Sequence, residues 1–191
     1  MACRNCRSKR CNCFINIKES SPEKGSCDID ISIESTVQGD NNDFVIQFSF
    51  NTTIDLYDIT TYLEEGLDIY DHTTTIENNV SITIPNWDDV NAVIEILGYS
   101  GSLLSPCFSK LYNVVYHLIP GTTSPNEEVD ISELCIDSYE VLFNNTGSSF
   151  VIEEGIMTAG PDSIESSSFL VLFVTCNDPE SEYILIMLFN D

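Results

Sequence analysis

Hydrophobic and polar side chains alternate along several stretches of this chain, and this period of two restricts the fold more than any other feature. In residues 28–34 an isoleucine occupies every second position, with acidic or hydroxyl side chains between. Residues 44–50 repeat the pattern with phenylalanine and isoleucine, and residues 79–84 repeat it before Pro85. Successive side chains of a β-strand point to opposite faces, so each stretch predicts a strand with one buried face.

Further stretches with β-branched and aromatic residues predict additional strands at residues 91–99, 110–119, 134–143, 149–153, 168–176 and 182–189. Within them, residues 169–174 are apolar at every position, which is typical of a strand buried on both faces. Segments rich in Gly, Asn, Ser and Pro separate the stretches and predict turns. The sequence therefore predicts an all-β fold, an antiparallel β-sandwich or a jelly-roll-like domain.

Residues 87–97 fit two structures. Asn86 could cap a helix that carries apolar side chains from Val90 to Leu97 at helical spacing and ends at Gly98. Against this, the segment is rich in β-branched residues, and with residues 110–119 it fits a hairpin equally well. We favour the strand and keep the helix as the alternative.

Charge divides the chain into two parts. The whole chain has 31 acidic and 7 basic residues, and six of the bases lie within residues 1–24, where two acids leave a net charge of +4. Residues 25–191 carry one base, Lys110, and a net charge of −28. We expect a basic Cys-rich N-terminal arm, residues 1–24, and one acidic β-sandwich domain, residues 25–191, called the arm and the body below.

The acidic body restricts the partners that its surface can bind. Such a surface repels nucleic-acid backbones and anionic membranes, so we expect neither as a partner. Hydrophobic residues make up 42% of the chain, which argues against disorder. We also expect no signal peptide and no membrane span, because the longest apolar runs, 169–174 and 184–189, have only six residues each.

The arm contains four closely spaced cysteines, Cys3, Cys6, Cys11 and Cys13, among the cations Arg4, Arg7, Lys9 and Arg10. Three hypotheses fit them: one tetrahedral Zn²⁺, disulfides, or a reduced basic peptide that docks on another protein. The first pair has zinc-knuckle spacing, but the close second pair is unusual for ligands of one ion. We expect no cofactor apart from this candidate zinc site, and we assign the four cations to partner binding.

The remaining cysteines, histidines and acidic pairs, which could be catalytic or bind a metal, are interpreted as structural or surface residues. Cys135 and Cys176 lie in apolar patterns and are interpreted as buried reduced thiols, with a bridge between them as the alternative. His72 is expected in an exposed Thr-rich loop and His117 on a strand. No nucleotide-binding, zinc-protease or hydrolase motif is complete, and adjacent acidic pairs are interpreted as solvated surface, so we do not expect an enzyme.

The chain resembles the small virion proteins of tailed bacteriophages in its composition. The resemblance consists of an acidic all-β body, strands and turns rich in Asn, Asp, Ser, Thr and Ile, and the arm of residues 1–14. Such families include head and tail fibre, decoration, and neck or tail adaptor proteins. The resemblance implies a non-enzymatic structural protein that is assembled in the host cytoplasm into a virion. Its partners would be other proteins of the assembly, with copies forming a homo-oligomer or symmetric ring anchored by the arm.

Two other functions are compatible with the sequence. A carbohydrate- or receptor-binding sandwich could use the exposed faces of aromatic side chains, with Tyr57, Trp87 and Tyr99 as candidates, although core packing is the favoured interpretation of such residues. An acidic DNA-mimic inhibitor would need carboxylates at phosphate-like spacing. The regular hydrophobic strands argue against that second alternative.

Overall fold

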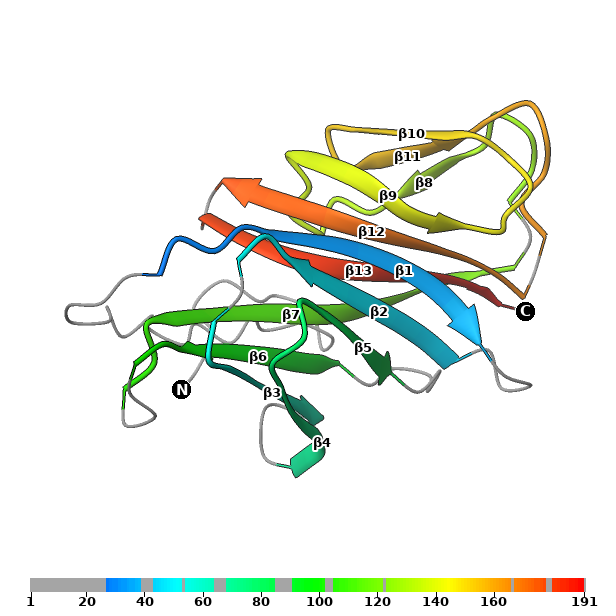
Figure 1. Ribbon diagram of the computed structural model, residues 1–191. Coiled ribbons are helices and arrows are strands. Elements are labelled where there is room, and N and C mark those ends of the chain that lie inside the picture. The colour runs from blue at the N-terminus through cyan, green and yellow to red at the C-terminus, as the bar shows by residue number, and fades with distance from the viewer. Residues whose placement is uncertain are drawn as a thin grey trace.

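The computed structural model describes residues 27–38, 43–52, 54–63, 68–84, 91–101, 105–121, 123–165, 167–177 and 180–190. Within these ranges the protein is all-β: it contains β-strands and turns but no helix (Figure 1). The arm lies outside the described residues, as does Trp87.

The largest sheet has seven strands in the order β4-β3-β6-β7-β13-β12-β9. Its strands are β3 (Leu56–Leu63), β4 (Asp68–Thr75), β6 (Ala92–Tyr99), β7 (Phe108–Pro120), β9 (Ser138–Asn144), β12 (Ser168–Asn177) and β13 (Glu180–Asn190). Neighbouring strands are antiparallel except β7 and β13, which run parallel. We call this the central sheet, because a smaller sheet lies on each of its faces (Figure 1).

Each smaller sheet has three strands. The first, in the order β1-β2-β5, consists of β1 (Ile31–Gln38), β2 (Asp43–Phe50) and β5 (Asn79–Ile84). The second, in the order β10-β11-β8, consists of β8 (Glu128–Asp130), β10 (Phe150–Glu153) and β11 (Ile156–Ala159). Both are antiparallel throughout.

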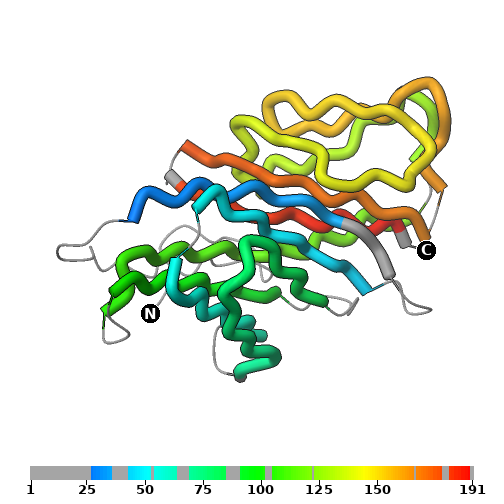
Figure 2. The backbone as a smooth tube through the Cα atoms, in the orientation of Figure 1, coloured from blue at the N-terminus to red at the C-terminus, as the bar shows by residue number. Residues whose placement is uncertain are grey.

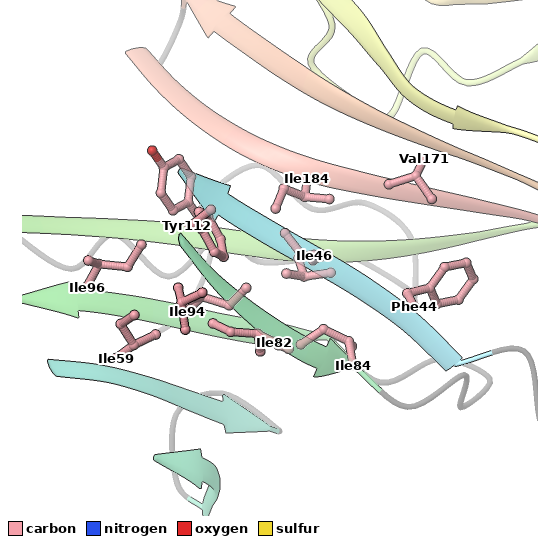
Figure 3. Packing of buried hydrophobic residues seen from close by; sticks show 14 of the residues in the cluster. Phe44, Ile46, Ile59, Ile82, Ile84, Ile94, Ile96, Tyr112, Val171 and Ile184 are labelled. Carbon is pink, nitrogen blue, oxygen red and sulfur yellow. The ribbon is translucent and has the colours of Figure 1, made fainter. Parts of the chain in front are cut away.

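The first core lies between the β1-β2-β5 sheet and the central sheet. Figure 3 shows how side chains from the two layers meet: Phe44, Ile46, Ile82 and Ile84 from one, and Ile94, Tyr112, Val171 and Ile184 from the other. All eight are almost completely buried. The alternation in β2 and β5 therefore places each inward residue in this core, as the period of two predicts.

The second core lies on the opposite face of the central sheet, beneath the β10-β11-β8 sheet. Leu170 and Leu172 of β12 and Leu185 of β13 point into this core, whereas Val171 and Ile184 point into the first. Strands β12 and β13 are thus buried on both sides, which explains why residues 169–174 and 184–189 are apolar at every position.

The structure agrees with most of the strand predictions and corrects some. Of residues 87–97, the structure describes 91–97, and residues 92–99 form strand β6, so the strand interpretation is confirmed for this part, whereas 87–90 lie outside the described residues. The predicted strand at 134–143 begins later, at Ser138, and the parallel β7–β13 pair departs from a purely antiparallel arrangement. Strands β3 and β4 were not predicted, because threonines and acidic residues obscure their alternation. Strands β8 and β11 were not predicted either, and with three and four residues they are too short to show a clear period.

The turn between β10 and β11 provides a test of the backbone geometry. Glu154 and Gly155 both have positive φ, 49° and 78°, as the tight hairpin turns favoured between strands require. A Cβ on Gly155 would lie 2.7 Å from the Ser132 Cα, whereas one on Gly147, with φ 74°, would meet nothing within 4 Å.

We expect Gly147→Ala to lower the free energy of unfolding by about 1 kcal/mol, since only the left-handed backbone penalises it. Gly155→Ala carries the same penalty plus a backbone clash, so the loss should be larger by a further 1–3 kcal/mol. Urea denaturation of the two variants measures the difference. Equal losses would show that the contact with Ser132 relaxes without cost.

Candidate interaction surface

The aromatic residues suggested for ligand stacking do not gather on one described surface. Tyr57 is 0% exposed, its ring stacks on Phe50 with centroids 4.0 Å apart, and its hydroxyl donates to the Thr52 carbonyl over 2.5 Å. Burial raises the pKa of this hydroxyl. Tyr57 therefore packs in the first core, and its ring faces are not available to a ligand. Tyr99 is half-buried at the end of β6, and its carbonyl accepts from the Asp55 amide.

The residues assigned to zinc or to partner binding, Cys3, Cys6, Cys11, Cys13, Arg4, Arg7, Lys9 and Arg10, lie outside the described residues. Both hypotheses for the arm stay predictions.

The interpretation of Cys135 and Cys176 as reduced thiols is wrong, and the alternative, a bridge between them, is confirmed. Cys27 and Cys107 form a second disulfide, which was not predicted. Spacing along the chain could not identify these pairs, because 41 and 80 residues separate their members and only the folded chain brings them together. Disulfides persist in oxidising surroundings, so the folded body is suited to such a setting.

The two disulfides lie at different places on the central sheet. Cys27, the first described residue, follows the arm closely, and backbone hydrogen bonds link it to Cys107 and Cys107 to Gly98 of β6. The disulfide therefore fastens the arm's attachment point to the central sheet.

The second disulfide joins the end of β12 to the segment before β9. Asp137 lies beside it, with Oδ2 3.7 Å from the Cys135 Sγ and 2.7 Å from the Asn177 amide that donates to it. These two sulfurs and the carboxylate are close enough to hold a metal ion in principle. Because the sulfurs are bonded to each other, neither is a thiolate ligand while the disulfide persists.

The central sheet carries a polar surface where the β10-β11-β8 sheet does not cover it. On β3, Asp58, Thr60 and Tyr62 alternate with the buried residues and lie on the face opposite the first core. The Asp58 carboxylate is 2.7 Å from the His72 Nε2, and the Tyr62 hydroxyl donates to Glu95 over 3.0 Å. His72 thus lies on strand β4 rather than in the expected loop.

His117 lies on β7, as expected, and contacts Glu133. Its Nδ1 is 3.4 Å from the Glu133 carboxylate, and its side chain is largely buried. Burial lowers the pKa of His117, and the charge of Glu133 offsets this lowering in part.

Strand β4 is an open edge of the central sheet. It pairs with β3 on one side, and no strand of the described ranges pairs with it on the other (Figure 2). The opposite edge strand, β9, contacts β1 of the first sheet. Ile69 on β4 is 65% exposed, and Ile76, directly after the strand, is 67% exposed. We call the outer edge of residues 68–76 the β4 edge.

The β4 edge differs from the edge of the first sheet. On β5 the exposed positions are Asn79, Ser81 and Thr83, all polar. Exposed apolar side chains on an open edge are uncommon in soluble proteins, which usually protect their edges from pairing. This surface was not predicted, because strand β4 was not predicted. The run of threonines at 73–75 is the signal that the sequence offers for it, since threonine favours strands.

Two comparisons with known proteins bear on this chain. No protein-family model matches the chain, and no curated protein does either. Over the described residues, the structure has no helix with the length and apolar character needed to cross a membrane.

The Cys27–Cys107 disulfide should stabilise the body substantially. It closes a loop of about 80 residues, and removing such a crosslink typically costs about 2–4 kcal/mol, largely by enlarging the unfolded ensemble. We expect the double variant Cys27→Ser/Cys107→Ser to lose this amount in urea denaturation without reductant. Peptide mapping of the wild type under non-reducing conditions should show the linked peptides, and their absence would contradict the assignment.

Protonation of His117 should weaken the fold in mild acid. Because its pKa is lowered in the folded state, the unfolded chain binds the proton more readily. The free energy of unfolding should therefore fall as the pH drops below about 6.5 and continue to fall towards the folded-state pKa. Urea denaturation between pH 7.5 and 5.5 should show a shallower decline for His117→Gln than for the wild type. Parallel curves for the two proteins would contradict this expectation.

Proposed function

We propose that this protein is a non-enzymatic structural component of a large assembly, of the kind found in tailed-phage virions. In this proposal the body is a β-sandwich of the jelly-roll-like type, and the cationic arm anchors each copy to an acidic neighbour. The copies form a homo-oligomer or a symmetric ring, together with other proteins of the same assembly.

The observation that carries the proposal is the location of positive charge. Lys110 is the only Lys or Arg in residues 25–191, and its Nζ is 2.7 Å from the Glu182 carboxylate. The same Nζ lies 5.6 Å from the centre of the Tyr112 ring. The single lysine or arginine of the body thus forms an ion pair within the body. The arm is therefore the main source of cationic charge for contact with another copy.

This division of charge suits an assembly physically. Bodies of net charge −28 repel one another and stay dispersed, while an arm of +4 is attracted to the body of a neighbour. The two body disulfides support a protein that works in an oxidising setting, as a released particle does.

Self-association of the full chain tests the proposal. We expect sedimentation equilibrium in non-reducing buffer to show oligomers at low salt and weaker association at high salt, because salt screens attraction between exposed charges. The variant Arg4→Ser/Arg7→Ser/Lys9→Ser/Arg10→Ser should weaken association at least tenfold.

Lys110→Gln is the control, because it removes a cation of the body but leaves the arm unchanged. It should associate like the wild type. A full chain that stays monomeric at every salt concentration would contradict self-assembly, and equal association of both variants would contradict the anchoring role of the arm.

A further inference from the structure

The β4 edge has the properties of an acceptor for an added strand. Its outer side is unpaired within the described part of the sheet, and Ile69 and Ile76 expose apolar side chains to solvent there. A strand added to an open edge gains main-chain hydrogen bonds, and side chains beside it supply specificity.

The charge of the β4 edge favours a cationic strand. Asp71 on β4 and Glu77 just after it are both exposed. A second β4 strand would bring like charges together, and like charges in adjacent strands destabilise the pairing. The edge therefore disfavours its own copy and favours a basic segment.

One segment of this chain meets that requirement. Residues 14–18 have the sequence Phe-Ile-Asn-Ile-Lys, and Lys9, Arg10 and Lys24 flank them. In an extended conformation Ile15 and Ile17 would share one face, and Lys18 would lie on the other. This is the cationic part of the chain that also has β-branched residues at strand spacing.

The position of Cys27 limits the direction in which the arm of the same chain can run along β4. Cys27 is attached near the end of β6, where β3 begins, and β4 runs towards that end. An arm segment that leads directly into Cys27 from the same chain would therefore run parallel to β4. Antiparallel pairs have the better hydrogen-bond geometry.

An antiparallel strand over Ile69 from the same chain is within reach, but it requires the connecting residues 19–26 to be almost fully extended. From the end of such a strand back to Cys27, the chain would run along about six residues of strand and across about three strand spacings. The straight-line distance is roughly 24 Å. The eight residues 19–26 span at most about 26–29 Å when fully extended. A second copy has no such constraint, so it can place its arm in the favoured direction.

We propose that residues 14–18 of one copy add as an antiparallel strand to the β4 edge of a second copy. This inference rests on the proposed function and names the surface that the arm occupies. Contact between Ile69 and the isoleucines of the arm stabilises the pairing, and the arm's cations find Asp71 and Glu77 beside the edge.

Substitution at the exposed edge residue provides the first test. Ile69→Lys in the full chain removes the apolar contact and places a cation before the incoming arm, so the concentration for half-association should rise at least tenfold. Val151→Lys is the matched control, because Val151 is also exposed, at 51%, but lies on β10; it should associate like the wild type. Equal near-UV circular dichroism of both variants and the wild type shows that each has folded.

Crosslinking provides the second test and identifies the chains. Equal amounts of ¹⁴N- and ¹⁵N-labelled full chains are mixed and treated with a carbodiimide that joins amines to carboxylates. We expect Lys9 to be linked to Glu77 in peptides of mixed label, because an antiparallel arm with Ile17 opposite Ile69 places Lys9 opposite Glu77. Links within one copy, or links to other carboxylates only, would overturn the proposal.

The experiments distinguish failure of self-assembly from failure of the β4 edge as its site. If the wild type associates, the arm variant does not, and Ile69→Lys associates normally, the assembly function stands and the β4 edge is not its site. If the wild type does not associate at all, the proposed self-assembly fails, and this inference fails with it.

Discussion

Burial of β12 and β13 on both faces is the interaction on which the rest of this structure depends. Their alternate side chains enter two different cores, so the same two strands hold the β1-β2-β5 sheet on one face and the β10-β11-β8 sheet on the other. Burial of a large aliphatic side chain contributes roughly 1.5–3 kcal/mol relative to exposure. Loss of either strand would therefore remove side chains from both cores at once.

Outside these cores, electrostatics determines how the molecule can meet others. Only Lys110 interrupts the negative charge of the body, and Glu182 already pairs with it. Close approach of two bodies is therefore unfavourable unless cations lie between them. The Cys27–Cys107 disulfide, with the backbone hydrogen bonds beside it, fastens the start of the described body to the end of β6 in the central sheet.

The sequence was a good guide to strands with a clear hydrophobic face and a poor guide to the others. Residues 44–50 and 79–84 each have one apolar side and were predicted correctly as β2 and β5. Strand β4 has few apolar residues because it is an edge, and this exposure is what makes it a candidate surface. The same cause thus hid the strand from sequence reasoning and made it available for binding. Tyr57 shows the converse, because an aromatic residue that suggested a ligand site packs entirely within the core.

The sequence by itself determined the all-β class, the two-sided burial of residues 169–174 and the separation of a basic arm from an acidic body. These properties depend on local periodicity and composition, which can be read along the chain. Only the tertiary structure decided the disulfide partners, the parallel pairing of β7 with β13 and the position of β4 at an open edge. Each of these joins residues far apart in the chain, and period-two patterning specifies which face of a strand is buried but not which strand lies beside it.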